Sequence, residues 1–237
     1  MYSKPVISVI VPAYNEAERI ASCIQALQRQ TIRFPYEIIV SDNGSVDETE
    51  SLAKAFGVRV VSTSMKGYSY ALRRGVLSSS SNLIAIIDAD CLPPPDWLAR
   101  IYKHFNDSSD VIAVGGPFEF YDGPWWIQRI VNISNAIYPH LLTASLCGMN
   151  MVFRRCAYDA VGGFDPSVNL QADTELGYRL MRYGSVVFDA QLVMRASGRR
   201  YQSFGRAFLE VLRRIINVAA IRLTGKPIHY SFVDVRS

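Results

Sequence analysis

The sequence contains few of the residues that form disulfide frameworks, zinc sites or redox motifs. Only three of its 237 residues are histidines and four are cysteines, and no two cysteines form a CxxC pair. The cysteines are Cys23, Cys91, Cys147 and Cys156. Because they lie far apart in the sequence, we expect reduced and mostly buried thiols, as in a cytoplasmic protein. The histidines form no visible cluster, and we assign no chemistry to them.

Long apolar runs, strong charge and glycine-rich phosphate loops are missing as well. No segment reaches about 18 uninterrupted apolar residues, and the apolar run near the N-terminus stops at Pro12, so we expect neither a membrane span nor a signal peptide. A formal net charge of +4, with no interleaved basic and aromatic residues, argues against nucleic acid as a partner. No G-x-G-x-x-G pattern follows the first expected strand, which disfavours a Rossmann dehydrogenase.

What the sequence does contain is a regular alternation of strands and helices. Apolar runs predict strands over residues 6–11, 37–41, 58–62 and 83–87, and helical spacing predicts helices over 16–30, 47–56 and 69–77. Further along, the pattern predicts helices over 97–105, 127–142, 172–183 and 204–222 and strands over 111–114, 150–153, 186–188 and 192–194. This alternation predicts an α/β fold with a mostly parallel sheet, and the absence of repeats or linkers predicts one two-lobed domain.

Polar or aromatic residues follow three of the first four expected strands. Tyr14 follows the first strand, Asp42 ends the second, and Asp88 and Asp90 follow the fourth. Ligands bind parallel sheets at the carboxyl ends of the strands, so we expect these side chains to share one site. There an aromatic ring could stack on a nucleobase, and Asp42 could accept a hydrogen bond from it.

The sequence Asp88-Ala89-Asp90 places two carboxylates on the same side of an extended segment. On its own, such a D-x-D sequence is more typical of a solvated surface turn. Two carboxylates so close together repel each other, and a divalent cation relieves the repulsion. Oxygen ligands suit Mg²⁺ or Mn²⁺, which bind one or two carboxylates together with the phosphates of a substrate.

Four segments of the chain, taken in order, resemble the nucleotide-binding half of the family 2 glycosyltransferases, which have the GT-A fold. They are SVIVPAYNE, IIVSDNGSVDET, KGYSYALRRG and IIDADC. The segments CGMNMVFRR, GGFD and ADTELGYRL resemble the downstream half of that family, so the resemblance extends from Val6 to about Gly184. It implies a Rossmann-like sheet flanked by helices, within a single domain over residues 1–237. The expected parts are a nucleotide-sugar-binding half over 1–115, an acceptor and catalytic half over 116–200, and an amphipathic tail over 201–237.

The resemblance implies an inverting, metal-dependent transfer of a sugar from a UDP- or GDP-sugar to an acceptor hydroxyl, in cell-surface polysaccharide or glycolipid synthesis. The implied nucleotide-binding residues are Pro12, Ala13, Tyr14, Glu16, Asp42, Gly67 and Asp88. Asp90 is the implied ligand of Mn²⁺ or Mg²⁺. Gly148 and Asn150 match a segment that approaches the donor sugar. Arg199 and Arg200 could bind the leaving diphosphate, which suits the geometry of guanidinium groups.

Asp173 is the implied catalytic base, because it matches the aspartate of the family's E-D-x-x-L-x-x-R motif. Leu176 and Arg179 are in register with that motif, whereas Ala172 replaces its glutamate. Glu175 lies on a different side of the expected helix, so we do not exchange the two roles. Asp173 could instead, or in addition, cap the N-terminus of that helix.

The expected helix over 204–222 is amphipathic. Its apolar face consists of Ala207, Phe208, Val211, Leu212, Ile215, Val218 and Ala219. We expect this face to pack on the domain core or on a second subunit, although a basic amphipathic helix could also lie at the inner face of a membrane. Together with the apolar surface around Trp125, it keeps a lipid-linked saccharide as an alternative acceptor to a free saccharide.

Two other functions remain as alternatives. A sugar-phosphate nucleotidyltransferase would also need a nucleotide site with a carboxylate-bound metal, but its glycine-rich phosphate loop is missing from PAYNEAER. A non-catalytic nucleotide-sugar-binding module is the second alternative, and Ala172 is the best argument for it. The family's membrane-embedded polymer synthases carry a Q-x-x-R-W motif that is absent here.

Overall fold

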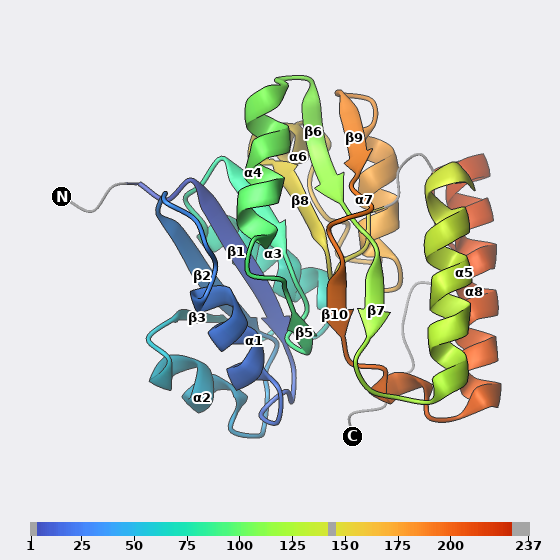
Figure 1. Cartoon of the computed structure of the whole chain (residues 1–237), viewed down its shortest axis with the longest axis horizontal. Coiled ribbons are helices and arrows are strands. Elements are labelled where there is room, and N and C mark those ends of the chain that lie inside the picture. The colour runs from blue at the N-terminus through green and yellow to red at the C-terminus, as the bar shows by residue number, and fades with distance from the viewer. Residues whose placement is uncertain (1–3, 142–145, 229–237) are drawn as a thin grey trace.

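The computed structural model describes residues 4–141 and 146–228, which form two sheets surrounded by helices (Figure 1). The large sheet consists of β1 (Ile7–Ala13), β2 (Tyr36–Asp42), β3 (Arg59–Ser62), β4 (Leu83–Ile86), β6 (Val111–Gly115), β8 (Met151–Arg154) and β9 (Ser185–Phe188). The small sheet consists of β5 (Cys91–Leu92), β7 (Phe118–Phe120) and β10 (Met194–Ala196). The helices are α1 (Ile20–Gln28), α2 (Thr49–Ala55), α3 (Tyr68–Ser78), α4 (Trp97–Asp107), α5 (Trp125–Leu141), α6 (Arg155–Ala160), α7 (Ala172–Leu180) and α8 (Phe204–Thr224), with a 3₁₀ turn η1 (Arg199–Tyr201).

The strand order of the large sheet is β3-β2-β1-β4-β8-β6-β9. Strands β1 to β4 pair in parallel, and β8 runs antiparallel to both of its neighbours, so the sheet is mostly parallel as predicted. The register pairs Ala13 with Asp42 and Ile10 with Ile86. The ends of β1, β2 and β4 therefore lie side by side, which brings the residues that follow them to one edge.

The core occupies both faces of the sheet, because successive side chains of a strand point to opposite faces. Along β1, Val9 and Val11 belong to the core beneath α1, α2 and α4, while Ile10 belongs to the core beneath α3, α6 and α7 (Figure 1). All three side chains are fully buried. These two layers fix β1 at the centre of the domain.

Several element boundaries differ from those that the sequence predicts. Helix α1 begins at Ile20 instead of Glu16, because the chain after β1 first turns and the N–H of Glu16 donates to Thr49 Oγ1 at 2.7 Å. The strand expected over 192–194 is β10 and begins only at Met194. The pattern does not predict the short elements β5, β7 and α6. The last residue of the helix expected over 127–142 lies outside the described residues.

The 204–222 stripe packs on the domain core only in part, so that half of the expectation is wrong for its large residues, and packing on a second subunit stays a prediction. Helices α5 and α8 lie at the edge of the molecule farthest from β3 (Figure 1), and their first turns are in contact through the rings of Trp126 and Phe204. Phe208 and Ile215 of the stripe are 59% and 61% exposed, whereas Ala207 is buried. Among the described residues, we find no helix that is long and apolar enough to cross a membrane.

Gly75 allows α3 to pack directly on the sheet. A Cβ atom at this position would lie 2.2 Å from Cγ2 of Ile10, which is fully buried and has no room to move. Ser41 Oγ donates to the carbonyl of Ala71 at 2.7 Å and fastens the same helix to β2. The spacing between α3 and β1 therefore depends on the absence of a side chain at Gly75.

We expect Gly75→Ala to lower the free energy of unfolding by about 1–3 kcal/mol, because the added methyl group overpacks the contact with Ile10. Gly205→Ala is the matched control, since a Cβ atom there meets nothing within 4 Å. Gly205→Ala should raise the free energy of unfolding by up to about 1 kcal/mol, because alanine has the higher helix propensity. Urea unfolding of both variants checks this, and equal stabilities would contradict the close-packing argument.

Candidate active site

A cleft of about 380 Å³ opens at the carboxyl ends of β1, β2 and β4. Eight of the thirteen site residues predicted from the sequence line it: Pro12, Ala13, Tyr14, Glu16, Gly67, Asp88, Asp90 and Arg200. The sequence does not predict four further polar residues of its wall, which are Asn43, Lys66, Tyr68 and Asn169. Asn43 and Tyr68 adjoin predicted residues, so position alone could have indicated them, whereas Asn169 comes from a distant loop.

The wall formed after β1 and β2 is fixed by hydrogen bonds between the two turns. Asn15 has a left-handed backbone conformation, with φ of 51°. Its N–H donates to Ser45 Oγ at 3.0 Å, and its side-chain oxygen accepts the N–H of Val46 at 3.0 Å. These bonds hold Tyr14, the predicted base-stacking residue, at the mouth of the turn.

The structure does not bring the Asp42 carboxylate to the cleft. Asp42 is only 2% exposed, and its oxygens accept the N–H groups of Gly44 and Ser45 and the Ser45 hydroxyl at 3.0, 3.1 and 2.5 Å. Its side chain thus shapes the turn after β2, and the neighbouring Asn43 lines the cleft instead.

Gly67 closes the cleft at the start of α3. Asn43 Oδ1 accepts the N–H of Gly67 at 2.8 Å, and Asn43 Nδ2 donates to the carbonyl of Met65 at 2.9 Å. Gly67 has φ of 137°, and a Cβ atom there would lie 2.9 Å from Oδ1 of Asn169. A side chain at this position would therefore be strained and would displace Asn169 from the wall.

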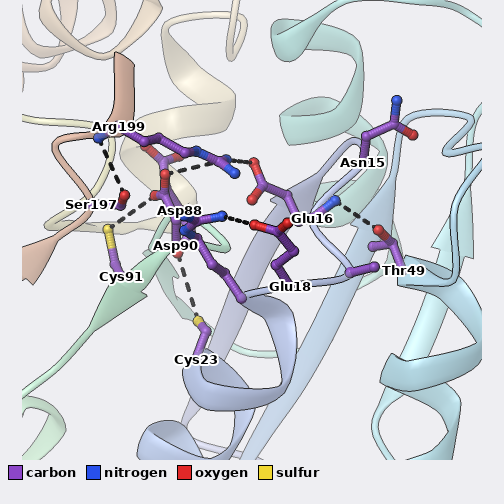
Figure 2. A network of polar contacts seen from close by, with 12 residues as sticks. Asn15, Glu16, Glu18, Cys23, Thr49, Asp88, Asp90, Cys91, Ser197 and Arg199 are labelled. Carbon is purple, nitrogen blue, oxygen red and sulfur yellow. Dashed lines mark hydrogen bonds and ion pairs between the residues drawn. The ribbon is translucent and has the colours of Figure 1, made fainter. Parts of the chain in front are cut away.

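The carboxylates of Asp88 and Asp90 lie together after β4 (Figure 2). Burial raises the pKa of Asp88 and the charge of Asp90 raises it further, whereas Arg200 and the hydroxyl of Tyr68 oppose the rise, with a pKa of about 6 as the result. The Tyr68 hydroxyl donates to Asp88 Oδ1 at 2.9 Å. The pair is thus short of positive charge, as the sequence indicates.

Arg199 supplies part of that charge. Its guanidinium group forms an ion pair with Glu16 and lies 3.4 Å from Oδ2 of Asp90 (Figure 2). Asp122 accepts hydrogen bonds from the Ser197 hydroxyl and from the N–H just before Arg199, which fixes the turn that carries the arginine. Both predicted arginines therefore lie beside the two carboxylates that follow β4.

Asp173 lies near the opposite end of this acidic group, in the first turn of α7. Its carboxylate accepts the N–H of Gly148 at 2.5 Å and the N–H of Thr174 at 2.8 Å. A Cβ atom on Gly148 would lie 2.7 Å from the Tyr68 hydroxyl, so a side chain at this position would have to displace that hydroxyl. Asp173 also contributes to the raised pKa of Asp88, which places the two carboxylates in one electrostatic environment.

The N-cap alternative for Asp173 is wrong, because α7 begins at Ala172 and Gln171 occupies the cap position. Ala172 is buried in the core, where the family's glutamate would stand. Glu175 is also buried and accepts two hydrogen bonds from Arg179, at 2.6 and 2.5 Å. Glu175 is therefore engaged in the structure of α7, and Asp173 is the accessible carboxylate of the motif.

The structure does not bring Asn150 into the cleft either. Asn150 is fully buried, and its Oδ1 accepts the indole N–H of Trp97 at 2.9 Å. Its Nδ2 donates to the carbonyls of Pro117 and Leu192 at 3.2 and 2.6 Å. These bonds use its donor and acceptor atoms to join β8 to α4 and to two loops.

Asp88 and Asp90 suit a divalent cation that is only partly coordinated by protein. Within residues 4–141 and 146–228, no three His, Cys, Asp or Glu side chains are grouped as a complete metal site. Two carboxylates at an open cleft, one with a pKa raised by burial and by its neighbour, match the ligand set of Mg²⁺ or Mn²⁺ that takes its other ligands from phosphate and water.

A cleft at the carboxyl ends of parallel strands, with paired carboxylates and arginines, is the arrangement of an α/β enzyme that binds a phosphorylated ligand. Residues 8–162 match the model of glycosyl transferase family 2. Because this match covers more than half of the sequence, the chain belongs to that family and is a glycosyltransferase.

Two relatives of this chain come from archaea. Over 124 residues the chain is 39% identical to glycosyltransferase AglE of Haloferax volcanii, and this match covers 49% of the chain and 40% of AglE. Over 117 residues it is 32% identical to dolichol-phosphate mannosyltransferase of Pyrococcus furiosus, covering 47% of the chain and 33% of that protein. Both matches thus span less than half of the relative.

Solved structures confirm the predicted GT-A fold. Mannosyltransferase PcManGT of Pyrobaculum calidifontis, in complex with GDP-Man and Mn²⁺, superposes with a TM-score of 0.74 at 21% identity, covering 94% of this chain and 65% of that one. Glucosyl-3-phosphoglycerate synthase of Mycobacterium tuberculosis, in complex with Mn²⁺, UDP-glucose and phosphoglyceric acid, gives a TM-score of 0.68 at 21% identity, covering 94% and 81%.

In metal-free buffer we expect Asp88→Asn to stabilise the protein above about pH 7, by about 1–3 kcal/mol. The native pKa of Asp88, about 6, lies above the ordinary value, so its ionisation costs folding free energy as the pH rises. Below about pH 4 the native carboxyl group is protonated and the variant should match the wild type. The exposed Asp159, changed to Asn, serves as control, and urea unfolding across pH measures the difference. A variant that is less stable than the wild type at high pH would contradict the prediction.

Proposed function

We propose that the protein transfers a sugar from a nucleoside-diphosphate sugar to an acceptor hydroxyl, with inversion at the anomeric carbon and a divalent cation as cofactor. One observation carries this proposal: a single cleft joins the turn after β1, the carboxylates after β4 and the arginine segment η1, with Asp173 close by. These are the groups that a base, a diphosphate and a reacting hydroxyl need.

The donor fits the cleft with its base toward Tyr14 and its diphosphate toward Asp88 and Asp90. Tyr14 offers an aromatic face for stacking, and Asn43 offers a neighbouring amide. Lys66 and Arg200 add positive charge to the same wall, which favours phosphates. The similar solved structures hold GDP-Man or UDP-glucose, as their descriptions state, so both nucleotides are candidates.

The cation would be held by Asp90, with Asp88 beside it on the ribose side. When bound, it would neutralise charge on the diphosphate and thereby improve the leaving group. Mn²⁺ accompanies the donor in both of the similar structures described above, which supports testing it first and Mg²⁺ second. Arg199 and Arg200 remain near the carboxylates and are placed to attract the diphosphate.

Asp173 is the proposed catalytic base. It accepts the proton of the acceptor hydroxyl as the acceptor oxygen bonds to the anomeric carbon and the bond to the diphosphate oxygen breaks. The N–H groups of Gly148 and Thr174 hold the carboxylate, and each carboxylate oxygen keeps a second lone pair for the proton. Asp173 as a residue is partly exposed, which leaves room for an acceptor to approach it.

The acceptor is proposed to be a saccharide or a lipid-linked saccharide, as in cell-surface polysaccharide or glycolipid synthesis. The name of the Pyrococcus furiosus relative, dolichol-phosphate mannosyltransferase, contains a lipid phosphate, which supports an acceptor carried by a lipid. The exposed apolar side chains of α5 and α8 support it as well, because a lipid-linked acceptor has an apolar part that such side chains could contact.

The test compares Asp173→Asn, Asp90→Asn and the control Asp159→Asn. Asp173→Asn should lower the transfer rate by roughly 100-fold or more while leaving donor binding intact, because only the proton acceptor is lost. Asp90→Asn should lose the rise in melting temperature that Mn²⁺ and a nucleotide-sugar produce together. Thermal shift with a panel of UDP- and GDP-sugars and a released-nucleotide assay provide the two readouts.

A wild-type rate in Asp173→Asn would overturn the assignment of the base. If no nucleotide-sugar raises the melting temperature of the wild type with either Mn²⁺ or Mg²⁺, the proposed donor class is wrong. The control variant should behave as the wild type in both assays.

A further inference from the structure

Helix α8 turns its apolar face away from the domain. Phe208, Ile215 and Leu223 are 59%, 61% and 85% exposed. Its inner face contains the fully buried Asn217, whose side-chain oxygen accepts the N–H of Ile228 at 3.1 Å. A surface helix of a monomeric protein normally buries its apolar stripe, so this orientation indicates a partner for the outer face.

The outer face is wider than the seam of a coiled coil. Its large apolar residues are Phe208, Leu209, Leu212, Ile215, Ile216 and Leu223, all of them exposed. At 3.6 residues per turn they cover an arc of about 120°, whereas the seam between two coiled helices is a narrower stripe. The face therefore fits an extended apolar surface better than a single second helix.

Helix α5 extends this surface. The rings of Trp126 and Phe204 are in contact, with centroids 5.2 Å apart, so the first turns of α5 and α8 are joined. Trp125 is 72% exposed, with the guanidinium carbon of Arg129 5.0 Å from the centre of its ring. Exposed tryptophan beside arginine is typical of side chains at the boundary between lipid and water.

The charge of the two helices decides between the candidate occupants. Arg214 lies on the inner side of α8 and Arg213 pairs with Glu210, so the exposed charges beside the outer face are Arg129 of α5 and, near the end of α8, Arg222 and Lys226. Arg222 and Lys226, both exposed, lie beside Leu223 at the end of α8. Two copies of such a basic surface would repel each other, whereas anionic lipid headgroups would attract it.

We propose that the outer faces of α5 and α8 form a docking surface for the interface of an anionic lipid bilayer. The apolar side chains would enter the boundary between headgroups and acyl chains, and Arg222, Lys226 and Arg129 would contact the phosphates. The surface lies outside the residues assigned to the donor, so docking does not depend on the proposed function of the cleft.

The test measures co-sedimentation of the whole chain with vesicles of phosphatidylcholine and of a phosphatidylcholine–phosphatidylglycerol mixture. We expect stronger binding to the mixture, weakened by salt. The triple variant Phe208→Gln, Leu212→Gln, Ile215→Gln should bind more than about tenfold more weakly, because its side chains no longer favour the interface. Arg222→Gln combined with Lys226→Gln should remove the preference for the anionic mixture.

Leu77→Gln on α3 is the matched control, since Leu77 is 75% exposed but lies outside this surface, and it should bind as the wild type. Melting temperatures confirm that all variants are folded. Absence of wild-type binding to either vesicle, or unchanged binding by the triple variant, would overturn the proposal. Light scattering tests whether a second copy of the chain covers this face instead. A stable dimer that the triple variant dissociates, together with no vesicle binding, would identify the face as a subunit interface and overturn the proposal.

Discussion

Repulsion between carboxylates at the ends of β1 and β4 governs the organisation of the site. The parallel register sets these ends side by side, so that Glu16, Asp88 and Asp90 meet in a partly buried place. Burial raises the pKa of Asp88 most, and the like charge of Asp90 at short range raises it further. Within the described chain, Arg199 and Arg200 offset only part of this repulsion. The sheet therefore holds a group of carboxylates whose mutual repulsion the proposed cation would relieve.

The residues that build this arrangement divide into those that face the cleft and those that support it. Asp42 and Asn150 are polar residues at strand ends or starts, and both use their side chains on backbone groups of neighbouring segments. A sequence motif does not separate the two roles, because either role requires a polar side chain at the same position. Asp42 and Asn43 are both buried and both bond backbone groups, so only their positions relative to the cleft distinguish them, with Asn43 in its wall.

The sequence predicts much of the fold because strand and helix periods alternate clearly through the first hundred residues. The sites at the ends of β1 and β4 follow from that alternation, since parallel strands end at one edge. Asn169 is different: it reaches the cleft from a loop more than a hundred residues after β2, so no local pattern could indicate it. The short strands β5 and β7 both take their hydrogen bonds from β10, and two or three residues carry too little periodicity to predict them.

The orientation of α8 is even harder to predict from a local sequence pattern. The spacing of its apolar residues predicts a helix, but which face turns outward depends on what the rest of the domain presents to it. Burial raises the pKa of Cys147 to about 12, with Asp173 adding to the rise and Arg214 on α8 opposing it, so the charged inner side of α8 lies close to the segment that precedes Gly148. Gly148 in turn donates to the proposed base. A bilayer against the outer face of α8 would thus lie one helix away from the acceptor end of the cleft, which is where an acceptor anchored in that bilayer would have to arrive.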